Sequence, residues 1–83
     1  MTRSMRLQEV QDFVEAYART LTSEDPRFSW SVMVILEDHG VRFFVNAFAV
    51  KVGPEWLAVI PEHDDVWVIE MNDVHNFYVL VTQ

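Results

Sequence analysis

The stretch VRFFVNAFAVKV, residues 41–52, decides the fold that we expect. Its β-branched and aromatic residues are typical of a strand, and it is longer than most strands of globular proteins, which predicts a bend or a bulge. Successive side chains of a strand point to opposite faces, so the adjacent residues Phe43 and Phe44 place one ring on each face. Both faces of the sheet that contains this strand therefore need cover.

Further strand-like runs surround this stretch, at about 28–36, 55–60, 66–71 and 77–82. They show little of the apolar and polar alternation expected of a sheet with one wetted face. Short connections rich in turn-forming residues separate them, and such connections favour antiparallel pairing. We expect about five strands in a twisted, mainly antiparallel sheet.

The segment before these runs predicts one amphipathic helix at about 4–22. Ser4 is a candidate N-cap, and Pro26 follows the helix and forces an extended or turning backbone at the residue before it. The apolar residues recur at intervals of three and four, as a helical stripe requires: Leu7, Val10, Phe13, Val14, Tyr17, Ala18 and Leu21. We therefore expect residues 1–83 to form a single α+β domain with the helix packed on one sheet face.

The order of a helix, five strands and a one-turn link before the last strand resembles Sm-like and other SH3-like small bent barrels. The spacing Met71-x-x-Val74-x-x-Phe77 is similar to the apolar spacing of those folds across the last link. This resemblance implies an alternative architecture, in which the sheet curls into a small barrel with the helix outside. Val45 and Lys51 stand where that family has a glycine and an aspartate in its second strand.

Composition limits the classes of protein that the chain can belong to. Its 83 residues make one domain, and 51% of them are apolar. The strands therefore carry more apolar surface than one short helix can cover, which predicts a dimer or a partner protein. The absence of cysteine excludes disulfides, cysteine-ligated zinc and a thiol nucleophile. No apolar run reaches the roughly 20 residues of a membrane span and no signal peptide is visible, so we expect a cytoplasmic protein without membrane contact.

Charge is unevenly distributed along the chain. The net charge is −7, and the region after Val52 contains six acids and no lysine or arginine. Direct nucleic-acid binding is not expected, because it requires basic residues that neutralise phosphates. The acidic residues of the expected surface, whose charge either keeps the domain soluble or faces a basic partner, are Glu62, Asp64, Asp65, Glu70 and Asp73.

Catalytic patterns are weak. His63 lies among three carboxylates, which suggests a divalent metal site or acid-base chemistry, although residues of such a loop usually point to water. His39 and His75 each lie near an aspartate, but no serine occupies a recognisable nucleophile position. We expect no cofactor, no metal and no catalytic residue.

Aromatic residues complete the list of candidates. Trp and Tyr often anchor protein interfaces, and we assign this role to Trp30, Phe44, Phe48, Trp56, Trp67 and Tyr78. The leading hypothesis is a small acidic non-enzymatic interaction module, such as an adaptor, chaperone-like or inhibitor protein, that self-associates or docks a partner through an apolar sheet face. The alternatives are an acidic nucleic-acid mimic that inhibits a basic protein, and a small metal-dependent or acid-base enzyme that uses His63 and its carboxylate neighbours.

Overall fold

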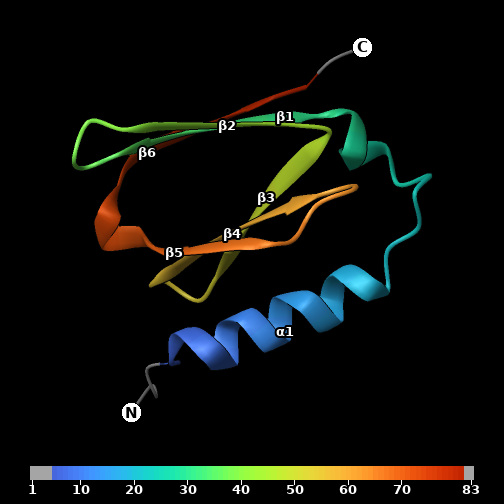
Figure 1. Ribbon diagram of the computed structural model, residues 1–83, viewed down its shortest axis with the longest axis horizontal. Coiled ribbons are helices and arrows are strands. Elements are labelled where there is room, and N and C mark those ends of the chain that lie inside the picture. Colours follow the sequence, from blue (N-terminus) through green and yellow to red (C-terminus); the bar gives the residue numbers. More distant parts are fainter. Residues whose placement is uncertain (1–4, 82–83) are drawn as a thin grey trace.

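The computed structural model describes residues 5–81 and contains one helix and two antiparallel three-stranded sheets (Figure 1). The outer sheet has the strand order β2-β1-β6, and the inner sheet has the order β3-β4-β5. The elements in chain order are α1 (Leu7–Arg19), the 3₁₀ helix η1 (Pro26–Ser29), β1 (Ser31–Leu36), β2 (Val41–Val45), β3 (Ala47–Val52), β4 (Trp56–Pro61), β5 (Trp67–Glu70), the 3₁₀ helix η2 (Met71–Asp73) and β6 (Val74–Leu80).

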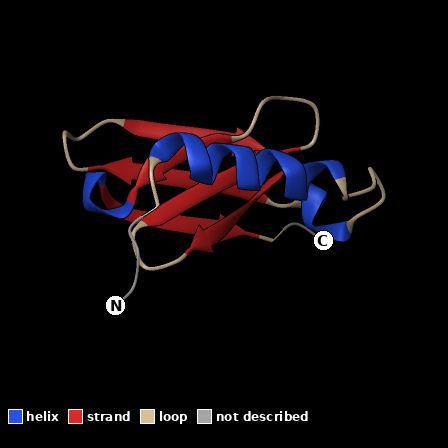
Figure 2. Cartoon of the chain, turned by 90° about the horizontal axis from the view of Figure 1, so that it is seen from below, coloured by secondary structure: helices blue, strands red, loops and turns tan. Residues whose placement is uncertain are grey.

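The elements form three layers, with the inner sheet between α1 and the outer sheet (Figures 1 and 2). Val10 and Val14 of α1 are buried against one face of the inner sheet, where they join Phe48 and Trp56. The opposite face of the inner sheet packs on the outer sheet through a second apolar cluster. The helix therefore covers one of the two sheets, and among residues 5–81 the outer sheet is covered only on its inward side.

Strand β4 contributes to both clusters. Leu57 and Val59 lie in the cluster between the sheets, whereas Ala58 and Ile60 lie in the cluster under the helix. All four are essentially inaccessible to solvent. This two-sided burial accounts for the continuous apolar sequence of the strand.

The run expected as one long strand is divided at Asn46, which adopts a positive φ of 53°. The part before it, β2, pairs with β1 in the outer sheet, and the part after it, β3, pairs with β4 in the inner sheet. Two backbone hydrogen bonds hold the bend: Ala47 N–H donates to the Trp30 carbonyl and Glu62 N–H donates to the Asn46 carbonyl, both at 2.9 Å. The single sheet of about five strands is thus replaced by two sheets that share one bent segment.

The first strand begins later than expected, because residues 26–29 form η1. Asp25 caps η1 by accepting a hydrogen bond from Arg27 N–H, and proline is favoured in a first turn. Phe28, expected to begin the strand, is buried in the cluster between α1 and the inner sheet. The helix itself is shorter than expected: Arg6 occupies the N-cap without a side-chain bond, and the candidate cap Ser4 lies outside the described residues.

The last link lies earlier in the chain than expected. The single turn is η2, and β6 begins at Val74 rather than Phe77. Glu37 N–H donates to the Asp73 carbonyl at 3.0 Å, which ties this turn to the end of β1. A register shift in the pairing of β1 with β6 falls between Ile35 and Leu36 at the same place.

A polar contact fixes the segment between the helix and β1. The guanidinium of Arg27 donates two hydrogen bonds to the carboxylate of Asp25, donates a third to the Tyr17 hydroxyl and lies 4.3 Å from the centre of the Phe48 ring. The side-chain hydrogen bonds from Arg27 lower the pKa of Asp25 to about 2, and those same bonds raise the pKa of Arg27. The contact therefore joins α1, η1 and the inner sheet.

Within residues 5–81, no helix combines the length and the apolar character that crossing a bilayer requires.

Candidate interaction surfaces

The outward side of the outer sheet is the first candidate site. Val32 and Val34 of β1 point into the cluster between the sheets, so the residues that alternate with them point outward. Residues that pair directly across antiparallel strands share a face, and Met33 pairs with Phe43 on one side and Tyr78 on the other. The outward residues of all three strands define what we call the open face: Ser31, Met33, Ile35, Val41, Phe43, Val45, Asn76, Tyr78 and Leu80.

The open face is apolar and accessible. Val41, Phe43 and Val45 along β2 are 58%, 56% and 63% exposed, and Tyr78 and Leu80 of β6 are 44% and 49% exposed. Large apolar side chains are therefore accessible along both strands that flank β1. Figure 1 shows no other element of the described chain over this face, because α1 lies on the far side of the inner sheet.

The open face carries no charge at neutral pH. Its polar groups are those of Ser31, Asn76 and Tyr78, and two of them bond to each other: Asn76 Nδ2 donates to the Tyr78 hydroxyl at 2.9 Å. The Asn76 side-chain oxygen accepts from Phe77 N–H at 2.9 Å. The central row of Phe43, Met33 and Tyr78 is therefore a neutral surface on a protein whose net charge is −7.

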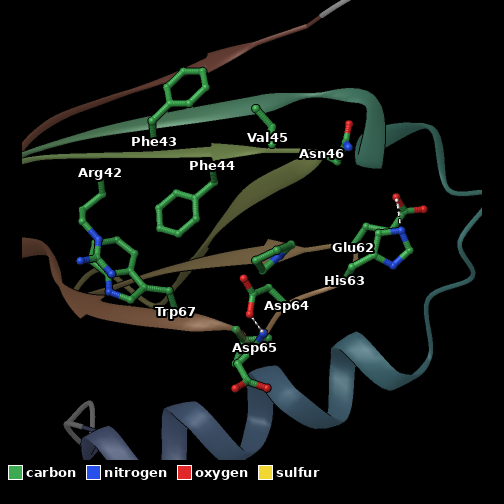
Figure 3. A pocket seen from close by; sticks show the side chains of 12 residues that line it. Arg42, Phe43, Phe44, Val45, Asn46, Glu62, His63, Asp64, Asp65 and Trp67 are labelled. Atoms are coloured by element: carbon green, nitrogen blue, oxygen red, sulfur yellow. Dashed lines mark hydrogen bonds and ion pairs between the residues drawn. The ribbon is translucent and has the colours of Figure 1, made fainter.

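The second candidate site is a groove of about 520 Å³ between β2 and the loop that joins β4 to β5 (Figure 3). Phe44 points into this groove while its neighbour Phe43 points away from it. The rings of Phe44 and Trp67 pack with their centres 5.4 Å apart, and the Arg42 guanidinium lies 5.5 Å from the centre of the Trp67 ring. One end of the groove thus has an aromatic wall with a single cation.

The other end of the groove is acidic. The side chain of Glu62 is 20% exposed and pairs with Nε2 of His63 at 3.2 Å, whereas His63 is 82% exposed. Asp64 and Asp65 follow, and Asp65 N–H donates to the Asp64 carboxylate at 3.1 Å. Within residues 5–81, no three His, Asp or Glu side chains gather closely enough to hold a metal ion. The geometry therefore gives no support to the metal site suggested for His63.

The other histidines are turn residues. His39 has a φ of 69° in the β1–β2 connection, where Asp38 accepts from Gly40 N–H rather than from the imidazole. Nδ1 of His75 lies 3.8 Å from Oε1 of Glu37, and both side chains are largely exposed. The histidine pairings that the sequence suggested, with Asp38 and Asp73, do not appear among the contacts of the described residues.

The six aromatic candidates lie in four different environments. Phe48 and Trp56 are 1% and 7% exposed and lie in the core under α1. Trp30 is half-buried against the same cluster. Phe44 and Trp67 line the groove, and Tyr78 lies on the open face.

The acidic candidates lie before β5 and at or after its end. Glu62, Asp64 and Asp65 line the groove, while Glu70 lies at the far end of β5 and Asp73 belongs to η2. Figure 1 places these two groups at opposite ends of β5. The acidic candidates thus lie at both ends of β5.

The sequence did not identify most of the open face. Met33, Phe43 and Leu80 were read as strand residues without a preferred side, because both faces of each run are apolar. A signal was present in residues 41–45, where Arg42 interrupts the apolar run and separates Val41 from Phe43. Arg42 faces the groove, and the residues on either side of it form the open face.

Comparisons with protein-family models, with curated proteins and with solved structures found no match to this chain.

Proposed function

We propose that this protein is a small non-enzymatic interaction module, of the adaptor, chaperone-like or inhibitor kind, that docks a protein surface on its open face. The observation that carries the proposal is the row of Phe43, Met33 and Tyr78, which stays accessible because α1 packs on the inner sheet rather than on this face. Contiguous exposed apolar patches on small proteins commonly mark interaction sites.

The composition of the open face supports this function. Burial of apolar surface is the main favourable term in protein association, and it amounts to roughly 25 cal/mol per Å². Aromatic residues and methionine are enriched in interface centres, where charged residues are depleted. Phe43, Met33 and Tyr78 occupy the middle of the face, and the charged residue Arg42 of the same strand faces the groove instead.

The test compares chemical labelling of the open face in dilute purified protein and inside the native cell. A photoactivated carbene label should modify Phe43 and Tyr78 in dilute solution and should modify them several-fold less in the cell. Phe13 on α1 is 57% exposed, close to the value for Phe43, and serves as the internal control that labels equally in both settings. Equal labelling of Phe43 in both settings would contradict the proposal.

A second candidate function, an acidic inhibitor of a basic protein, is favoured by the groove. Cations interact favourably with aromatic rings and with carboxylates, and the groove offers Trp67 together with Glu62, Asp64 and Asp65. A short lysine-rich and arginine-rich peptide should then bind with an affinity that falls steeply with salt. The double substitution Asp64→Asn and Asp65→Asn should abolish that binding, whereas Glu70→Gln at the other end of β5 should leave it unchanged.

We also infer that the two sheets together form a small bent barrel of the SH3-like kind. This interpretation is supported by the bend at Asn46, through which the order β6-β1-β2 continues into β3-β4-β5. It is further supported by η2, a single turn that joins β5 to β6. A closed arrangement of this kind leaves the open face on the outside of the barrel, where a partner can reach it.

A further inference from the structure

We infer that the occupant of the open face is a second copy of this chain, and that the two copies pack sheet against sheet as a symmetric dimer. This inference rests on the proposed docking function of the same face, whose partner it names.

The charge of the face selects a neutral partner. None of its nine side chains is charged at neutral pH, so a partner with a basic surface would lose hydration there without gaining an ion pair. The open face of another copy is a surface of matching neutrality that is always present where this protein is present. The net charge of −7 on each copy opposes approach, but that repulsion is screened beyond roughly 8 Å at physiological salt.

The layout of the face is self-complementary. β1 runs through its middle, with β2 on one side and β6 on the other. A two-fold axis parallel to β1, between the two copies, sets β2 of one copy over β6 of its partner. Phe43 of each copy then lies opposite Tyr78 of the other copy, with Met33 near the axis. Two sheets that pack in this way leave about 10 Å between them, which their side chains fill.

The size of the face sets the strength of the dimer. Three strands spaced by about 4.8 Å and five residues long at about 3.4 Å per residue span a flat area of roughly 240 Å². This flat area is well below the roughly 800 Å² of accessible surface that each partner buries in a standard interface. We therefore expect a dissociation constant in the micromolar range and a mass that depends on concentration.

The first measurement is the mass of the purified chain by sedimentation equilibrium between roughly 1 and 100 µM, a range that brackets a micromolar dissociation constant. The mass should rise from the monomer value of 9.8 kDa toward twice that value. Phe43→Lys should raise the dissociation constant at least about 30-fold, since a central aromatic residue is a typical hot spot. Phe13 on α1 is exposed to nearly the same extent as Phe43, and Phe13→Lys should leave the dissociation constant unchanged.

The second measurement mixes two variants. Phe43→Lys and Tyr78→Glu should each be monomeric while retaining the circular dichroism of the original chain. In an equimolar mixture the axis along β1 places the new lysine opposite the new glutamate, so a heterodimer should form that neither variant forms alone. If each variant is monomeric and the mixture stays monomeric, the assigned axis is wrong.

A monomer at every concentration would overturn the inference, and so would a dimer that survives both Phe43→Lys and Tyr78→Glu. Carbene labelling of that monomer separates this failure from a failure of the proposed function. Strong labelling of Phe43 and Met33 leaves the face open for a different protein, so that only the second copy is rejected. Weak labelling of both shows that the chain covers its own face, and then the docking function is rejected as well.

Discussion

The indole Nε1 of Trp56 donates a hydrogen bond of 3.1 Å to the backbone carbonyl of Met5, 51 residues away in the sequence. Trp56 begins β4, and Met5 precedes α1 by two residues. This bond joins the start of the helix to the inner sheet, while the contact of Arg27 with Tyr17 and Phe48 joins its end. The helix is thus held at both ends.

Trp56→Phe should lower the free energy of unfolding by about 1 to 2 kcal/mol, because it removes this hydrogen bond and part of a buried ring. Chemical denaturation at low protein concentration would measure the change. Trp30→Phe is the matched control, since Trp30 packs against the same cluster but its indole makes no hydrogen bond within residues 5–81. Equal losses in the two variants would show that the bond to Met5 contributes nothing.

Asn46→Val should destabilise the fold by about 1 to 2 kcal/mol, because a β-branched residue rarely adopts the positive φ of this bend. Asn46→Gly should change stability by less than about 1 kcal/mol, because glycine adopts that conformation without strain. Thermal unfolding of the two variants, followed by circular dichroism, makes the comparison. If valine is tolerated as well as glycine, the backbone at residue 46 does not bend as described.

Stability should fall between about pH 4 and pH 2 through the titration of Asp25. The pKa of this carboxyl is lowered from 3.8 to about 2 in the folded chain by its hydrogen bonds from Arg27, so the folded state favours the charged form. That contribution is complete above the ordinary pKa and is lost as the pH falls through the lowered one. The measurement is the midpoint of urea denaturation as a function of pH. Asp25→Asn should make this midpoint depend less on pH over this range, whereas Glu24→Gln, a change at an exposed neighbour, should leave its pH dependence unchanged.

Phe48→Ala should cost about 3 to 5 kcal/mol and bring the domain close to unfolding, because Phe48 is 1% exposed and packs 5.5 Å from the ring of Phe28. Phe43→Ala should change the stability of the dilute monomer by no more than about 0.5 kcal/mol, since its ring is more than half exposed. Urea denaturation of both variants tests the division between core and open face. A large loss for Phe43→Ala in the monomer would place its ring in the core.

Periodicity was enough to predict the helix and the antiparallel strands, because the stripe through Val10 and Val14 and the β-branched runs depend on local spacing. The division into two sheets was harder to predict, since both faces of residues 41–52 are apolar and neither face indicates a change of sheet. A signal existed at Asn46, a polar residue within that run and of a type that tolerates positive φ. The 3₁₀ turn at Phe28 was read as strand because an apolar residue in a short turn looks like the start of the strand that follows.

The positions of the candidate residues were harder to predict than the elements of the fold. Trp56 and Phe48 were assigned to an interface on residue type, but large aromatic residues serve cores and interfaces equally, and burial decides between the two roles. The open face depends on which residues pair across strands, such as Met33 with Phe43 and Tyr78. That register is a property of the folded chain, and strands that are apolar on both faces specify it weakly; Arg42 in β2 is the one charged residue of the three outer strands that marks a side.

The burial of β4 on both sides has a consequence for how the molecule opens. A motion that lifts α1 away exposes Ala58 and Ile60 but leaves Leu57 and Val59 enclosed, and a separation of the sheets does the reverse. Neither motion releases the strand, so its amide protons should exchange with deuterated water only when the whole domain comes apart, and last of all in the chain.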